Sequence, residues 1–410
     1  MEKTKLVLAF SGGLDTSRCL VDLSKEYDVY TCTVDTGALT EQDRIEIANK
    51  SKLLGAVSHK LIDAKQVYFQ EVIQYLIKGN VLKGGVYPLS VGAERGFQAI
   101  LTTQYAKEIN AQVIAHGSTG AGNDQFRFDM AIQVLAPEIE IKVPVREFNW
   151  SRQNHIDALR SYNMPIPEKP LYSINAGLWG TTIGGVETQA DFIEENGEKI
   201  YTGSWNYLPD EAFEAAGHNI NIETNPQEIV IGFASGVPIS LNSKEQNAVD
   251  LIEALNLLGD EYGIGRAIHT GSTVLGSKGR VGVAAPAPIL LIEAHRELEK
   301  SILTKSQLYL SKIISAEYER LIHEGLYLDP SIDDIKSYFD SCQSDITGEV
   351  RIKLVANNFV VMGYKSTNSI LGYGASYGEQ SLSFTGKDAE GFSKIYALES
   401  KIKNQVTKLY

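Results

Sequence analysis

Short apolar runs alternate with stretches of helical periodicity along the first third of the chain. The apolar runs predict strands at Leu6–Phe10, Asp28–Val34, His59–Asp63 and Val113–His116. Helices are predicted between them, ending near Lys25 and covering 41–54, 66–78 and 96–109. This alternation predicts an α/β fold with a doubly wound parallel sheet. Ligands of such sheets bind at the carboxyl ends of the strands.

The pattern changes after about residue 170. Hairpin signals occur at 228–241 and 348–364, and helical periodicity covers Ser243–Leu258, with a serine cap, and Pro288–Gly325. A stretch rich in Ser, Gly and Tyr, 366–386, is typical of a long loop. The last predicted helix, Ala389–Tyr410, carries an apolar stripe that can pack on its own domain or on a second subunit. The stripe consists of Phe392, Ile395, Leu398, Ile402 and Leu409.

The first apolar run leads into a glycine turn, Ser11-Gly12-Gly13, that opens a helix. Backbone N–H groups at such a helix start converge on one point, where hydrogen bonding and the helix dipole favour a phosphate. The loop lacks the lysine of a Walker motif and the spacing of a dinucleotide fingerprint. It is similar to the pyrophosphate loop of enzymes that cleave ATP between the α- and β-phosphates. The alternative is an ordinary strand–turn–helix connection.

A second glycine-rich loop follows His116, to which we assign no chemistry. The polar residues that come after the glycines are Asn123, Asp124, Arg127 and Asp129. An arginine beside two carboxylates suits an amino-acid substrate, whose carboxylate and ammonium must both be held. The alternative is a helix-capping loop with a surface ion pair.

Composition and charge exclude several classes of protein. The 410 residues suffice for two domains, and the net charge of −13 argues against a nucleic-acid partner or an anionic membrane surface. No apolar run approaches the roughly 20 residues of a membrane span, and no signal-peptide pattern precedes the first strand. The cysteines, Cys19, Cys32 and Cys342, form neither a zinc spacing nor a disulfide framework. We therefore expect a cytoplasmic protein.

Motifs in a fixed order carry a more specific resemblance. They are Ser11–Ser17, Tyr87–Leu89, Ala115–Phe128, Tyr172–Ile174, Leu178-Trp179, Gly263–Arg266 and Asp388–Phe392. In these segments the chain resembles the argininosuccinate synthase family. The resemblance implies a nucleotide-binding domain of the ATP-pyrophosphatase (PP-loop) type over 1–170, an α+β synthetase domain over 171–365, and a C-terminal loop and oligomerisation helix over 366–410. It also implies a homotetrameric ligase of arginine biosynthesis that joins citrulline to aspartate through citrullyl-AMP, using ATP and Mg²⁺ and releasing AMP and pyrophosphate.

The resemblance also implies roles for individual residues. For ATP these are Ala9, Phe10, Ser11, Gly12, Gly13, Leu14, Asp15, Thr16, Ser17, Val34 and Gly117. For aspartate they are Thr119, Asn123 and Asp124. For citrulline they are Tyr87, Asn123, Arg127, Ser173 and Thr182, the last in place of the usual serine. No protein side chain is assigned to the metal.

The chain departs from the family at the citrulline end. Gly92 replaces a serine, Ala121 a lysine, Gly271 a glutamate and Val283 a tyrosine. A lost carboxylate removes the partner of an α-ammonium, which is costly to bury unpaired. Candidate replacements are Glu94 and Glu187.

The departures leave alternative functions open. One alternative is the same chemistry on an N-acylated citrulline, which has no α-ammonium. Another is an inactive nucleotide-binding paralogue, although the retained polar residues of both loops argue against it. A tRNA-modifying relative is disfavoured, because it would need a basic surface.

Overall fold

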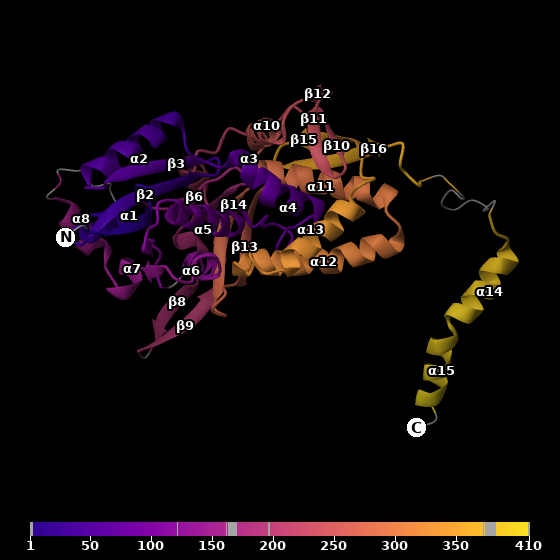
Figure 1. Ribbon diagram of the computed structural model, residues 1–410. Helices are drawn as coiled ribbons and strands as arrows, with labels where there is room; N and C mark the ends of the chain where they lie inside the picture. Colours follow the sequence, from indigo (N-terminus) through magenta and orange to yellow (C-terminus); the bar gives the residue numbers. More distant parts are fainter. Residues whose placement is uncertain are drawn as a thin grey trace.

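The first part of the chain folds into a parallel sheet, coloured indigo to magenta in Figure 1. The computed structural model describes residues 3–120, 122–160, 162, 170–195, 197–371, 373 and 383–408. The strand order is β3-β2-β1-β4-β5, and all neighbouring strands pair in parallel. The strands are β1 (Thr4–Ala9), β2 (Tyr27–Asp35), β3 (Ser58–Asp63), β4 (Val113–Ala115) and β5 (Glu140–Lys142).

Helices cover both faces of this sheet. Because side chains alternate along a strand, Val7 packs in the core cluster that contains α5, whereas Leu6 and Leu8 pack in a second cluster with α1, α2 and α8. The predicted doubly wound fold is confirmed. The helices around the sheet are α1 (Leu14–Leu23), α2 (Glu41–Leu53), α5 (Ser90–Glu108), α6 (Asp124–Leu135), α7 (Pro144–Glu147) and α8 (Arg152–Arg160).

Two predicted helices of this part differ in detail. The helix predicted over 66–78 is α3 (Lys65–Tyr68), a π-helical turn η1 (Phe69–Ile73) and α4 (Gln74–Lys78) in succession. Helix α5 begins at Ser90 instead of Gly96, directly after Leu89, which has a left-handed backbone (φ 61°). The earlier start matters, because the first two turns of α5 carry residues of the site.

The second part contains two antiparallel sheets and a separate hairpin. One sheet has the order β13-β14-β7-β6 and the other β12-β11-β10-β15-β16, and the two predicted hairpins, β10–β11 and β15–β16, are confirmed. The strands are β6 (Ser173–Asn175), β7 (Thr181–Gly184), β8 (Asp191–Glu195), β9 (Glu198–Gly203), β10 (Gln227–Ala234), β11 (Val237–Leu241), β12 (Lys244–Glu245), β13 (Arg266–Ser272), β14 (Lys278–Ala284), β15 (Gly348–Val355) and β16 (Asn358–Lys365).

The helices of this part correct two expectations. The predicted serine cap at Ser243 is wrong: that residue has a positive φ of 64° in the turn before β12, and Asn247 caps the helix by accepting from Asp250 N. The long helix predicted over 288–325 is two helices, because Thr304 and Gln307 form a capping box that starts the second. The helices are η2 (Val186–Thr188), α9 (Asp210–Ala215), α10 (Ala248–Glu261), α11 (Pro286–Ile302), α12 (Lys305–Glu324) and α13 (Ser331–Cys342).

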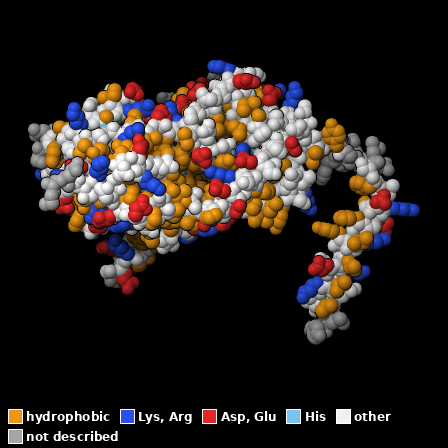
Figure 2. Space-filling model, in the orientation of Figure 1, with side chains coloured by type: hydrophobic (Ala, Val, Ile, Leu, Met, Phe, Trp, Pro, Cys, Tyr) orange, Lys and Arg blue, Asp and Glu red, His pale blue; other side chains and the backbone are white. Residues whose placement is uncertain are grey.

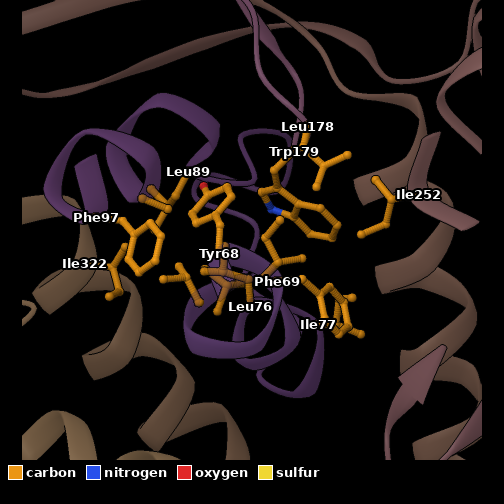
Figure 3. Close-up of a cluster of buried hydrophobic side chains, with 14 of the residues drawn as sticks. Tyr68, Phe69, Leu76, Ile77, Leu89, Phe97, Leu178, Trp179, Ile252 and Ile322 are labelled. Atoms are coloured by element: carbon orange, nitrogen blue, oxygen red, sulfur yellow. The ribbon is translucent and has the colours of Figure 1, made fainter. Parts of the chain in front are cut away.

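A single large core joins the two parts. Figure 3 shows Tyr68 and Leu76 packed with Trp179 and with side chains from both parts of the chain. Trp179 is 1% exposed, and its Nε1 donates to the carbonyl of Pro88 at 3.0 Å. The turn at 87–89, just before α5, is therefore held from the second part.

The C-terminal helices stand away from this body. Figure 1 shows α14 (Gly386–Tyr396) and α15 (Leu398–Thr407) as an arm, and neither helix contains a buried residue. Figure 2 shows hydrophobic side chains along the arm. In α14, Phe392 is 64% exposed and Ile395 is 75% exposed. Leu409 of the predicted stripe lies outside the described residues. Within the described chain, no helix is long and apolar enough to cross a membrane.

Candidate active site

A cavity of about 630 Å³ opens at the carboxyl ends of β1, β2 and β4, where the fold predicts a ligand. Helix α5 and strand β6 complete its wall. The cavity is lined by most of the residues predicted to bind ATP or aspartate, but not by the two glycines of the first loop. The predicted residues in the wall are Ala9, Phe10, Ser11, Asp15, Thr16, Val34, Gly117, Thr119, Asp124 and Ser173.

The loop at 11–17 presents its backbone to this cavity. No side chain caps the start of α1, so the N–H groups of its first turn are free for an anion. Gly12 has φ +72°, and a Cβ there would lie 3.0 Å from Cγ1 of Ile47. Lys50 Nζ donates to the Gly12 carbonyl at 2.5 Å. The Lys50 contact ties the loop to α2, and the lack of a side chain at Gly12 lets the loop lie close to Ile47.

Asp15 is the carboxylate of this loop, with 48% of its side chain exposed. Its Oδ1 lies 3.4 Å from Nε2 of His155, a residue of α8 whose side chain is only 3% exposed. Burial lowers the pKa of His155, partly offset by Asp15, and its Nδ1 has no hydrogen-bond partner among the described residues. Sequence reasoning missed His155, because nothing in the spacing of α8 indicates contact with the loop.

The turn after β2 forms another wall. Asp35 is buried, accepts from Gly37 N at 2.8 Å, and pairs with Arg44 at 2.5 Å. Gln98 of α5 donates to the Val34 carbonyl and to Thr36 Oγ1, both at 3.3 Å. The turn is thus fixed from α2 and from α5.

His116, at the end of β4, also lines the cavity. Its Nε2 lies 2.9 Å from Oδ1 of Asp129, whose Oδ2 accepts from Arg146 at 2.7 Å. Burial opposes ionisation of Asp129, but these two partners hold its pKa below the usual value. No sequence pattern joins these residues, which lie on β4, α6 and α7.

The glycine-rich loop leads into an ionic cluster. Arg127 donates to Asp124 Oδ1 at 2.8 Å and to the carbonyl of His323 at 2.9 Å. Asp124 Oδ2 lies 3.6 Å from Arg95 Nε. Asn123 Oδ1 accepts from Val274 N at 2.9 Å, in the hairpin β13–β14. The loop is therefore tied to the second part of the chain; Ala121 lies outside the described residues.

Arg95 connects this cluster to the rest of the wall. It donates to Glu94 Oε1 at 3.1 Å and to Asn175 Oδ1 of β6 at 3.0 Å. Burial raises the pKa of Glu94, although Arg95 opposes the shift. Glu94, Arg95 and Asn175 all line the cavity. The sequence names Glu94 only as a candidate carboxylate, and the late start predicted for α5 left Arg95 unrecognised.

Tyr87 and Thr182 are not among the residues that line the cavity. Tyr87 OH accepts from Gly92 N at 3.2 Å, and a Cβ at position 92 would lie 3.3 Å from Arg127 Nη2. Thr182 pairs across the sheet with Asn175 of the wall and with Val283. Directly paired residues share a face of a sheet, so Thr182 continues the face that meets the cavity.

The side chain of His269 lies where a side chain at position 271 would begin. His269 lies two residues earlier on the same face of β13, and a Cβ at position 271 would be 2.5 Å from its Nε2. The imidazole packs on Tyr87, with ring centroids 5.3 Å apart. Sequence reasoning missed His269, because nothing in the spacing of β13 indicates that its ring contacts Tyr87.

The two candidate carboxylates lie elsewhere. Glu94 accepts from Arg95 and Gln98 in the cavity wall. Glu187 has its carbonyl bound by Arg280, whose side chain lies on the opposite face of β14 from Val283. The three atoms nearest to a Cβ at position 271 all belong to His269 and not to either carboxylate, and Glu187 Oε2 is buried without a hydrogen-bond partner in the described chain.

Comparison with known proteins decides the family. The argininosuccinate synthase N-terminal HUP domain matches residues 5–165, and the argininosuccinate synthase C-terminal domain matches 172–403. The chain belongs to the argininosuccinate synthase family. An argininosuccinate synthase from Dictyoglomus thermophilum is 37% identical over 98% of this chain and 97% of its own length. One from Pyrococcus furiosus is 34% identical over 97% and 93%.

These matches confirm the predicted family, its ligase class and its nucleotide-binding fold. An argininosuccinate synthase from Lactiplantibacillus plantarum, 34% identical over 99% of this chain and 96% of its own length, agrees. A solved structure, a predicted subunit of a tRNA methyltransferase from Methanocaldococcus jannaschii, covers 37% of this chain and 73% of its own. Its TM-score of 0.27 and 19% identity carry no argument.

Proposed function

We propose that the protein joins citrulline to aspartate in arginine biosynthesis, consuming ATP and releasing AMP and pyrophosphate. The observation that carries the proposal is one cavity onto which a phosphate-type loop (11–17) and an amino-acid-type loop (117–124) both open, in a chain of this family. The homologues that match nearly the whole chain are named argininosuccinate synthase.

The chemistry has two steps. The ureido oxygen of citrulline attacks the α-phosphorus of ATP, the bond to the β-phosphate breaks, and pyrophosphate leaves from the loop at 11–17. The amine of aspartate then attacks the ureido carbon, loses a proton, and displaces AMP. Positioning and charge stabilisation supply most of the catalysis in such transfers. Thr119, Asn123 and Asp124 would hold aspartate, while Tyr87, Arg127, Ser173 and Thr182 would hold citrulline.

Magnesium fits this site as a companion of the phosphates. Among the residues that the structure describes, no group of three or more His, Cys, Asp or Glu side chains is arranged to hold a metal. Mg²⁺ commonly keeps several waters and binds through substrate phosphates with few protein ligands. It would neutralise the charge of the departing pyrophosphate.

Product analysis tests the function. The protein is incubated with ATP, citrulline and aspartate, and the nucleotide products are separated. We expect AMP and pyrophosphate in equal amounts, dependent on both amino acids. ADP and phosphate, or no turnover while ATP still binds, would contradict the proposal, and the second result would favour the inactive paralogue.

We further propose that the arm formed by α14 and α15 assembles a homotetramer in the cytoplasm. The exposed Phe392 and Ile395 have no buried contact within their own chain, and the described cysteines are free and buried. Phe392→Asp and Ile395→Asp should reduce the mass measured by analytical ultracentrifugation. Lys394→Ala, on the same helix, is the matched control and should leave the mass unchanged; an unaltered mass in the aspartate variants would reject the role of the arm.

A further inference from the structure

An imidazole occupies the space from which a side chain at position 271 would start. His269 and Gly271 lie on one face of β13, and a Cβ at 271 would come within 2.5 Å of His269 Nε2. A contact this short cannot occur without moving the ring. The glycine and the histidine therefore form one arrangement in place of a longer side chain at 271.

The ring is held firmly, yet its nitrogens are free. Its plane packs on Tyr87 at 31°, and a Cβ at Gly84 would lie 3.2 Å from Nδ1. His269 is only 9% exposed, and no hydrogen bond to either ring nitrogen is found among the described residues. Neither ring nitrogen is among the buried polar atoms that lack a partner in the described chain, so both are open to solvent or to a ligand.

The surroundings keep this ring uncharged. Burial lowers the pKa of His269, Lys83 lowers it further, and Glu319 opposes the shift. Lys83 and Glu319 pair at 2.9 Å, so neither presents a free charge to the ring. At neutral pH the imidazole therefore has one N–H donor and one bare nitrogen that accepts.

We propose that His269 is the specificity-determining residue for the α-nitrogen of the ureido substrate, and that it recognises this nitrogen as a hydrogen-bond donor instead of as a positive charge. The inference rests on the proposed function, in which Tyr87 and Arg127 bind the same substrate. A bare imidazole nitrogen can accept an N–H from either an ammonium or an amide, although the ammonium is the stronger donor. A carboxylate would instead favour the cation.

The same end of the site has room for an acyl group. Gly271 and Gly279 face each other across the hairpin β13–β14, so this part of the sheet face carries no side chains. A Cβ at Gly85 would meet nothing within 4 Å. The substrate class is therefore citrulline with its α-nitrogen either free or acylated.

A panel of ureido substrates tests the inference on the wild-type protein, with pyrophosphate release as the readout. We expect kcat/KM for citrulline and Nα-acetylcitrulline to agree within about tenfold, since neither loses the hydrogen bond. 5-Ureidopentanoate, which lacks the α-nitrogen, should be about ten- to a hundredfold worse than citrulline. Discrimination between the first two by more than about tenfold, in either direction, would overturn the inference.

Variants assign the effect to His269. In His269→Ala the penalty for 5-ureidopentanoate should disappear, while KM for ATP stays unchanged. His269→Gln keeps an acceptor and should keep the penalty, and His269→Glu should make citrulline the better substrate by more than about tenfold. His59→Gln, another partly buried histidine on β3, is the matched control and should behave as wild type.

Each failure has a distinct meaning. If His269→Ala no longer binds ATP, the variant is misfolded. The inference is then tested by the wild-type substrate panel together with His269→Gln. A penalty that persists in a folded His269→Ala would overturn the assignment to this residue. Absence of turnover with every ureido substrate would overturn the proposed function itself, and this inference with it.

Discussion

At the phosphate end of the cavity the proposed binding groups are mainly those of the main chain, in a glycine turn and the first turn of α1, with a single carboxylate beside them. The proposed amino-acid end consists of side chains from distant segments, which are not among the residues that line the cavity: Tyr87 before α5, Arg127 on α6 and His269 on β13. Contacts such as Trp179 to the Pro88 carbonyl hold these segments together. The first end is local in sequence, and the second exists only in the folded protein.

The difference shows how such sites change. A backbone site depends on conformation, so few substitutions alter its chemistry without destroying it. A site built from side chains changes its substrate preference when one residue is exchanged, because each side chain recognises one group of the substrate. By the family resemblance the phosphate end keeps the expected residues, whereas at the proposed amino-acid end a glycine stands at position 271 with the His269 imidazole beside it. The predictions below test this contrast.

The largest effect is expected at the phosphate end. Asp15→Ala removes the only carboxylate in the loop at 11–17 and the partner of His155. We expect kcat to fall by at least about a hundredfold, since a group that stabilises the transition state is lost. Asp22→Ala, on the same helix but paired with Arg18, is the matched control. Normal turnover of Asp15→Ala would show that the loop is not the reacting end.

The next effect concerns the ionic cluster between the two ends. Asp124→Ala should raise KM for aspartate about ten- to a hundredfold, because a charge-assisted contact to the ammonium is lost. KM for ATP should change far less. Steady-state kinetics with each substrate varied in turn measures both. Glu140→Ala, an exposed carboxylate paired with Lys142, is the control; equal changes in both KM values would reject the assignment.

Acidification should affect the amino-acid end through His269. Its folded pKa is lowered by burial, so the bare nitrogen is present above that pKa and is lost as the pH falls through it. KM for citrulline should therefore rise, by up to about tenfold, on going from about pH 7.5 to about pH 5.5. His269→Gln should flatten this rise. A pH dependence that persists unchanged in the Gln variant would point to His155 or another group.

The smallest effect compares one glycine from each end. Gly12→Ala forces a left-handed backbone at φ +72° and a contact with Ile47, and should lower the free energy of unfolding by about 1–2 kcal/mol. Gly279→Ala has ordinary space, with Thr273 at 3.8 Å, and should change it by less than about 0.5 kcal/mol. Urea unfolding measures both. Similar losses in the two variants would contradict the contrast between the ends.

The sequence predicts what is local. The parallel sheet, the loop at 11–17 and the ionic residues after the second loop can all be recognised, because their signals lie within one strand–turn–helix segment. The division at Thr304 is also readable, since Thr304 and Gln307 have the spacing of a capping box. The cap predicted at Ser243 is wrong because Ser and Asn cap equally well, and only the strand β12 moves the helix start to Asn247.

The remaining site residues could not be predicted because tertiary packing brings them there. Arg95 and Asn175 meet in the cavity wall only when β6 packs beside α5. His269 meets Tyr87 only when β13 packs against the turn before α5. A single sequence contains no signal for such contacts between segments that lie far apart along the chain.

Arg95 touches groups on both sides of the cavity, since it binds Glu94 and Asn175 in the wall and approaches Asp124 in the loop. A ligand that moves the groups on one side of the cavity therefore changes the contacts of Arg95 with the groups on the other side. Thermodynamic reciprocity then requires that ATP and aspartate alter each other's equilibrium affinity by one common factor. Calorimetric titration of each ligand, with and without the other, would measure that factor twice, and Arg95→Ala should bring it close to one.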